Sequence, residues 1–136
     1  MCKILLATDG SQVSLRAAAQ VTRLIGAAEC KVVLLHVIST PDSLEAAEEV
    51  LEGMTDQAAA EAILVTQAAL GLPDDRVTAL IRLGSPVETI CAVAIEQGAE
   101  LIVLGHRGHS AIADLLLGSV SSAVVHQAPV SVLVCR

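Results

Sequence analysis

The sequence contains no phenylalanine, tyrosine or tryptophan. Proteins that bind single-stranded nucleic acids stack the bases on aromatic side chains, so that function class is not expected here. A core without aromatic rings must be filled by aliphatic side chains, and hydrophobic residues make up 54% of the chain. Buried parallel strands are rich in such residues, and alanine-rich helices pack closely on them. The missing aromatics therefore indicate a layered α/β fold.

Basic residues are scarce, because eight Lys and Arg stand against fifteen Asp and Glu, for a formal net charge of −7. Duplex DNA and anionic membrane surfaces attract basic proteins, so neither nucleic acid nor membrane is an expected partner. No apolar run reaches the roughly 20 residues of a membrane-spanning helix. Met1-Cys2-Lys3 leads directly into a short strand-like run, which is unlike a secretory signal peptide. We expect a cytoplasmic protein.

Cysteines at metal-binding or redox spacing are missing as well. None of the four cysteines belongs to a Cys-x-x-Cys motif, and each lies within or beside an apolar segment: Cys2, Cys30, Cys91 and Cys135. Metal sites built from cysteine need such ligand spacings. We therefore expect buried, reduced thiols and no metal or redox site made from them.

Short apolar runs alternate with helical stripes along the chain. The apolar runs predict strands at residues 3–8, 31–37, 77–83, 101–104 and 130–134. The third run alternates with polar residues, as expected of a more exposed edge strand. Apolar residues at helical spacing predict helices at residues 13–25, 42–69, 86–97 and 119–127. The second helix would be about 40 Å long, so it must project beyond the sheet or bend, with Gly53 as the weak point. Ser85, Pro86 and Glu88 predict a capping box at the start of the third helix.

Every crossover between strands contains a helix, which predicts parallel pairing and right-handed connections. The chain from 1 to 136 is therefore expected to form one domain, with a doubly wound five-stranded parallel sheet, strand order 3-2-1-4-5 and helices on both faces. In such sheets ligands bind beyond the carboxyl ends of the strands, where the strand order reverses. The loops at that point are residues 8–10 and 105–108.

A glycine pattern follows the fourth strand. Two residues separate Gly105 from Gly108, and nine separate Gly108 from Gly118, which with Ser119 stands at the start of a helix. Glycine can adopt positive φ and lets backbone amides approach an anion, and a helix start offers further N–H donors. Arg107 is the only lysine or arginine between residues 105 and 122, and guanidinium pairs well with phosphate. The hydroxyls of Ser119 and Ser121 could donate as well. The pattern predicts a phosphate cradle.

Other phosphate-binding signatures are missing, including the Gly-x4-Gly-Lys loop and a Gly-x-Gly-x-x-Gly run after the first strand. A phosphoacceptor domain of this topology would need an aspartate at the end of the third strand, which instead ends Arg82-Leu83-Gly84. Asp9 has two interpretations: contact with a ribose or a phosphate-bound cation, or a turn and N-cap aspartate.

The four histidines are expected to be structural or simply exposed. His36 lies at the end of a strand, and His126 lies in the last turn of a helix, where positive charge is favourable. His106 and His109 flank the glycine loop, where they could touch a phosphate, but they are expected to face solvent.

These motifs together resemble the nucleotide-binding subgroup of the universal stress protein family. That family's mark is Gly, two residues, Gly, nine residues, Gly and then Ser or Thr, which both spacings here match. The likeness extends to Asp9-Gly10-Ser11 and Leu35-His36-Val37. The resemblance implies that Ala7, Thr8 and Asp9 border the base and ribose and that Val37 contacts adenine. It implies that ribose and phosphates are held by Gly105, Arg107, Gly108, Gly118, Ser119, Val120 and Ser121. The sequence departs from the family pattern at Glu100 and His106, and neither departure changes a glycine of the motif.

The expected function is therefore binding of ATP, or of ADP or AMP, with Mg²⁺ or Mn²⁺ carried by the nucleotide phosphates, in a stress-response sensor or regulator. No catalytic residue is expected, and hydrolysis should be slow if it occurs. A slow ATPase and a nucleotide-free interaction module are the alternatives. The apolar last strand at residues 130–134 would form a bare sheet edge, and the resemblance also points to a homodimer through that edge.

Overall fold

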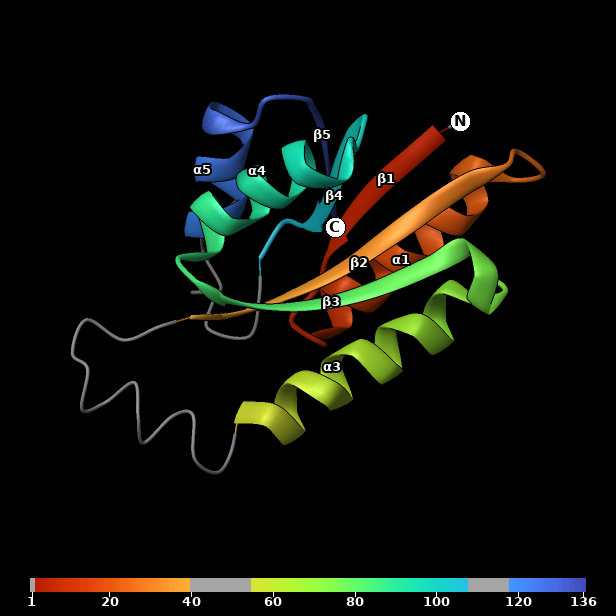
Figure 1. Ribbon diagram of the computed structural model, residues 1–136, viewed down its shortest axis with the longest axis horizontal. Helices are drawn as coiled ribbons and strands as arrows, with labels where there is room; N and C mark the ends of the chain where they lie inside the picture. The colour runs from red at the N-terminus through yellow and green to blue at the C-terminus, as the bar shows by residue number, and fades with distance from the viewer. Residues whose placement is uncertain (1, 40–54, 108–117) are drawn as a thin grey trace.

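The computed structural model describes residues 2–39, 55–107 and 118–136 (Figure 1). Five parallel strands form one sheet in the order β3-β2-β1-β4-β5, which confirms the predicted topology. The strands are β1 (Cys2–Ala7), β2 (Cys30–Ser39), β3 (Val77–Gly84), β4 (Leu101–Gly105) and β5 (Ser131–Cys135). The described helices are α1 (Gln12–Ile25), α3 (Thr55–Leu70), α4 (Pro86–Gln97) and α5 (Ser119–Gln127), with a single 3-10 turn, η1, at Asp74–Arg76.

The sheet is covered on both faces, as predicted. Helices α1 and α3 cover one face, and α4 and α5 cover the other (Figure 1). Successive residues of β1 point to opposite faces, so that Leu6 packs with α1 and Leu5 packs toward α4 and α5. Both side chains have no exposed surface. Burial on both faces explains why the central strands are continuous aliphatic runs.

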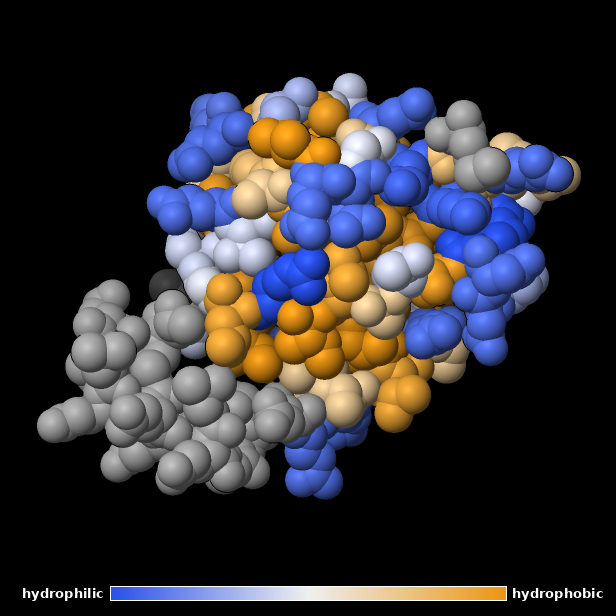
Figure 2. Space-filling view, viewed as in Figure 1, coloured by the Kyte–Doolittle hydropathy of each residue, from blue (hydrophilic) through white to orange (hydrophobic). Residues whose placement is uncertain are grey.

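Strand β3 is an exposed edge, in agreement with its alternating sequence. It pairs only with β2 among the described strands. Ile81 and Leu83 remain 44% and 50% exposed, and Figure 2 shows apolar surface on this side of the molecule.

Helix α3 is described from Thr55 to Leu70. The first part of the predicted 42–69 helix, Gly53 included, lies outside the described residues. Within the described part, the buried face consists of Ala59, Ala62, Ile63, Thr66 and Leu70. This face packs on α1 and β2, and it brings α3 close to the loop that follows β1.

The predicted capping box at the start of α4 is wrong in its chemistry. Ser85 occupies the N-cap position and Pro86 opens the helix, but the Ser85 side chain makes no capping bond. Its ψ of 125° differs from the 163° of Ser11. Ser11 does cap α1, by accepting a hydrogen bond from the backbone N–H of Ser14 at 3.3 Å. At its other end, α4 stops at Gly98 in the left-handed conformation (φ 68°), as expected.

Two of the cysteines correct the expectation of four reduced thiols. Cys2 and Cys30 form a disulfide, with Cα atoms 4.5 Å apart. They lie opposite each other where β1 pairs with β2, although 28 positions separate them in the sequence. Cys135 is buried and Cys91 partly buried, both as free thiols, and burial raises the pKa of each.

Within the described residues, no group of three His, Cys, Asp or Glu could hold a metal ion. In the same part of the chain, no helix is long and apolar enough to cross a membrane.

Candidate functional site

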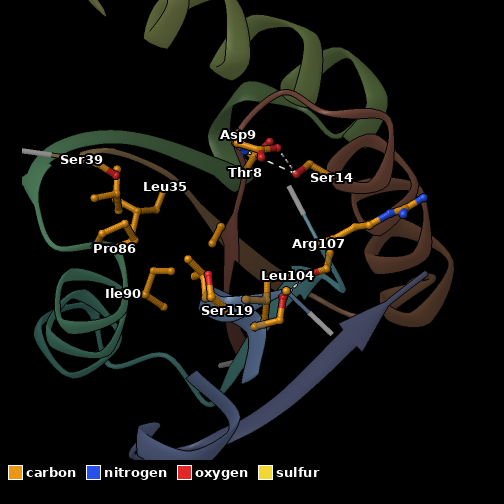
Figure 3. A pocket seen from close by; sticks show the side chains of 16 residues that line it. Thr8, Asp9, Ser14, Leu35, Ser39, Pro86, Ile90, Leu104, Arg107 and Ser119 are labelled. Atoms are coloured by element: carbon orange, nitrogen blue, oxygen red, sulfur yellow. Dashed lines mark hydrogen bonds between the residues drawn. The ribbon is translucent and has the colours of Figure 1, made fainter. Parts of the chain in front are cut away.

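A cavity of about 440 Å³ opens beyond the carboxyl ends of β1, β2 and β4 (Figure 3). This is the place where the strand order reverses, and it is closed on one side by the start of α5. Its lining residues are Ala7, Thr8, Asp9, Ser14, Leu35, Val37, Ser39, Pro86, Ile90, Leu104, Gly105, Arg107, Gly118, Ser119, Val120 and Ser121. Pockets of this size accommodate ligands of nucleotide size.

Every predicted site residue that the structure describes lines this cavity. Gly108 lies outside the described residues. The sequence interpretation missed Ser14, Leu35, Ser39, Pro86, Ile90 and Leu104. Ser14 could have been inferred from its place one helical turn after the Asp9 loop. The apolar residues among the others carry no signal that separates a cavity wall from core.

The cavity has an apolar side and a polar side. In Figure 3, Leu35, Pro86 and Ile90 face the space from one side, where Ser39 is the polar exception, while Thr8, Asp9 and Ser14 lie across it. Val37 and Leu104 add to the apolar lining. This division suits a ligand with a flat apolar ring at one end and polar groups at the other.

Asp9 is held within its own turn. Its Oδ1 accepts hydrogen bonds from the Ser11 backbone N–H and from Ser14 Oγ, each at 2.9 Å. The helix cap itself is Ser11. The turn interpretation of Asp9 is therefore confirmed, but its assignment as N-cap is wrong. A carboxylate fixed in this way has a defined position at the edge of the cavity.

The two described glycines of the motif serve close packing. Neither Gly105 nor Gly118 has positive φ, so that part of the prediction is wrong. A Cβ on Gly105 would lie 2.5 Å from Val13 Cγ1, and one on Gly118 would lie 3.2 Å from Arg107 Cα. Gly105 leaves room for the Val13 side chain of α1, and Gly118 lets the His106–Arg107 backbone approach, each more closely than any other residue would allow.

The start of α5 points backbone donors at the cavity. Gly118 is its N-cap, without a side-chain capping bond, and donates its own N–H to the carbonyl of His106. The next three residues, Ser119, Val120 and Ser121, open the helix, so their N–H groups have no carbonyl one turn earlier to bind. All three line the cavity. Together with the positive end of the helix dipole they form a place for an anion.

Ser121 has a different role from the one its sequence position suggests. Its hydroxyl, in a side chain only 3% exposed, donates to the carbonyl of Gly105 at 2.6 Å. This proton is therefore committed to holding the β4 loop against α5 and does not point at a ligand. Ser119, by contrast, is exposed at the cavity.

Arg107 contributes less charge to the cavity than expected. Figure 3 shows its side chain extending away from Ser119 and from the apolar side. Arg107 and Asp9 are the only charged residues among the described lining residues. In this arrangement the positive potential comes from the α5 start.

Two of the described histidines, His36 and His106, contact backbone carbonyls. His36 Nδ1 donates to the Thr8 carbonyl at 2.8 Å and so fixes the loop after β1. His106 is half-buried, with its backbone N–H donating to the Cys135 carbonyl at 2.7 Å and its Nδ1 3.3 Å from the same oxygen. The expectation that His106 faces solvent is therefore wrong. His126 lies in the last turn of α5, as expected, and His109 lies outside the described residues.

Comparisons with known proteins agree on one family. The sequence model of the universal stress protein family matches residues 1–136. A universal stress protein of Thermus aquaticus is 39% identical over 140 residues, which cover 98% of this chain and 97% of the relative. The structure of universal stress protein UspA from Lactobacillus plantarum superposes with a TM-score of 0.79 at 25% identity, covering 99% of this chain and 97% of that one. A universal stress protein in complex with cAMP superposes with a TM-score of 0.71 at 28% identity, with the same coverage.

Proposed function

The chain belongs to the universal stress protein family, and from that premise we propose that it binds an adenine nucleotide in the cavity between β1 and β4 and acts as a nucleotide-dependent sensor or regulator in stress responses. The observation that carries the proposal is the start of α5, whose first three residues line a cavity that also has an apolar side. The similarity to a structure that holds cAMP supports the same ligand class.

The geometry supports one orientation of the nucleotide. The adenine ring packs on the apolar side near Val37 and Ile90, where aliphatic side chains cover a flat ring. The ribose lies beside Thr8 and Asp9 at the end of β1. The phosphates reach the N–H groups at the start of α5, because that is where the helix dipole favours negative charge.

ATP with Mg²⁺ or Mn²⁺ is the proposed form of the ligand. Asp9 brings a carboxylate into the cavity lining, while the Arg107 side chain extends away from Ser119 and from the apolar side of the cavity. A divalent ion carried by the phosphates offsets the repulsion between the phosphates and Asp9. ADP and AMP fit the same contacts with fewer charges.

Rapid hydrolysis is not part of the proposal. Fast phosphoryl transfer needs a cation at the transferring group, a fixed metal and a residue that orients water. In the described lining, the Asp9 carboxylate is held by Ser11 and Ser14, which favours a role in positioning over one as a base.

We expect micromolar or tighter binding of ATP in the presence of Mg²⁺ or Mn²⁺, which corresponds to about −8 kcal/mol or better. Turnover should stay below about one per second, the lower end of the usual enzyme range. Mass spectrometry first shows that the protein is nucleotide-free, and calorimetry then measures its affinity for ATP. A phosphate-release assay measures turnover. If no heat of binding is observed, the binding proposal is wrong and the alternative of a nucleotide-free interaction module is favoured. Turnover above that limit would make the protein an enzyme.

A homodimer through β5 is a second proposal, supported by the open edge of that strand. β5 pairs only with β4 among the described strands, and Val132 and Val134 are half-buried along it. Antiparallel pairing with a second copy would cover this edge and remove an aggregation hazard.

We expect a dimer at micromolar concentration in sedimentation, and a monomer for Val132→Pro, because proline removes a backbone donor and blocks regular pairing. Ile81→Pro makes the same change on β3, the opposite edge of the sheet, and should leave the dimer intact. Circular dichroism checks that both variants are folded. A wild-type monomer, or a dimer lost only with Ile81→Pro, would contradict the proposal.

A further inference from the structure

Thr66 is a buried polar residue of α3 that does not line the cavity. Its side chain has no exposed surface. Its hydroxyl lies 2.7 Å from the hydroxyl of Thr8, which is itself only 6% exposed and lines the cavity. Fifty-eight positions separate the two residues in the sequence, so the contact joins two distant segments at the back of the site.

The direction of this hydrogen bond can be assigned. Thr66 Oγ1 lies 2.7 Å from the Ala62 carbonyl, which can only accept, so the single Thr66 hydroxyl proton goes there. Thr8 must then donate to Thr66 Oγ1. Thr8 Oγ1 in turn accepts from the Gly10 backbone N–H at 3.0 Å. A one-way chain of hydrogen bonds therefore runs from Gly10 through Thr8 and Thr66 to Ala62.

Close packing follows the same path. A Cβ on Gly10 would lie 3.1 Å from Ala62 Cα, so the turn after β1 rests directly on α3. Gly10 adopts a left-handed φ of 79° to do so. The Thr8 carbonyl is fixed from the other side by His36 of β2. The wall of the cavity that carries Thr8 and Asp9 is thus tied to α3 by both a hydrogen bond and a backbone contact.

We propose that α3 is the element that responds to nucleotide occupancy, and that Thr66 is the positioning residue that couples it to the cavity. This proposal rests on the proposed function, because it needs a ligand beside Thr8 and Asp9. A nucleotide that holds this loop in place holds Thr8 against Thr66 and so stabilises the docking of α3. Since such coupling is reciprocal, breaking the Thr8–Thr66 contact weakens nucleotide binding.

The first test uses the wild-type protein alone. ATP with Mg²⁺ should slow hydrogen exchange of the amides at residues 59–70, although only the loop and not α3 lines the cavity. The second test replaces Thr66 with valine, which keeps the shape but leaves Thr8 without its acceptor. We expect ATP and AMP to lose affinity by the same factor, about fivefold, because the change acts at the loop and not at the phosphates. The protection of α3 by ATP should also disappear.

Two matched variants separate coupling from ordinary destabilisation. Thr66→Ser keeps the hydroxyl and should restore both the affinity and the protection. Thr22 of α1 donates to the Leu70 carbonyl at the far end of α3 at 2.7 Å. Thr22→Val therefore weakens the contact between α1 and the C-terminal end of α3 but leaves the Thr8–Thr66 contact in place, and it should lower stability but leave affinity unchanged. Nucleotide binding without any change in α3 exchange would overturn the inference, as would equal losses of affinity in the Thr66→Val and Thr22→Val variants. Absence of binding in the wild type would instead overturn the proposed function.

Discussion

Replacing Gly118 with valine is expected to abolish measurable nucleotide binding while the protein stays folded. A Cβ at this position would lie 3.2 Å from Arg107 Cα and 3.3 Å from the His106 carbonyl oxygen. The two further methyl groups of valine would push the His106–Arg107 backbone away. They would also break the hydrogen bond from the Gly118 N–H to that carbonyl. The start of α5 would no longer hold its donors at the cavity.

Backbone strain is not the cause of this effect. Gly118 has φ −68° and ψ 163°, which any residue adopts. The effect should therefore grow with side-chain size. Gly118→Ala needs a shift of a few tenths of an ångström and should weaken ATP binding about tenfold, whereas Gly118→Val should weaken it at least about a hundredfold, or about 2.7 kcal/mol.

Calorimetry with ATP and Mg²⁺ on the two Gly118 variants provides the measurement, with thermal unfolding to show that they are folded. Ser119→Ala provides a comparison, because it keeps the backbone N–H and removes only the hydroxyl exposed at the cavity, so it should weaken binding by less than either Gly118 variant. Asp9→Asn should weaken binding by less than Gly118→Val, since an amide oxygen can still accept from Ser11 and Ser14. Wild-type affinity in Gly118→Val would refute the placement of the phosphates at α5.

The sheet could be predicted from the sequence because its strands are buried on both faces. Leu5 and Leu6, which are buried on opposite faces of β1, leave this central strand no polar face. The ends of the strands were harder to predict from the sequence. β2 continues to Ser39, which pairs with Gly84 of β3, and neither residue type marks a strand. Their pairing depends on the neighbouring strand and not on local preference.

The loops of the site were predictable, but the directions of its side chains were not. Motif spacing located the start of α5, yet it could not tell that the Ser121 hydroxyl binds the Gly105 carbonyl. Nor could it tell that Arg107 extends away from Ser119. The apolar side of the cavity is formed partly by Pro86 and Ile90 of α4, which meet the other walls only after folding. The Cys2–Cys30 disulfide could not be predicted from the sequence either, because only the pairing register of β1 and β2 brings the two cysteines together.

Gly105 supplies the sharpest test of how the glycine motif is built into the fold. Its missing Cβ leaves room for Val13 of α1, which is only 6% exposed and would have Cγ1 just 2.5 Å from an added methyl group. Gly105→Ala should therefore force α1 and β4 apart and lower the free energy of unfolding by about 2 kcal/mol, as overpacking of a tight core does. Chemical denaturation monitored by circular dichroism measures this loss.

The contact can be tested with a compensating change on the other side. Val13→Ala alone removes two buried methyl groups and should cost about 1–2 kcal/mol. In the double variant, the methyl group added at position 105 fills the space left at position 13, so the two costs should not add. We expect the double variant to be more stable than the sum of the single losses predicts by at least about 1 kcal/mol, the range found for residues in direct contact. Strict additivity would show that Gly105 is required for another reason, such as the 3.3 Å approach of its Cβ position to the Arg107 carbonyl. In that case the glycine would serve the shape of the loop, and nucleotide affinity would fall in Gly105→Ala without recovering in the double variant.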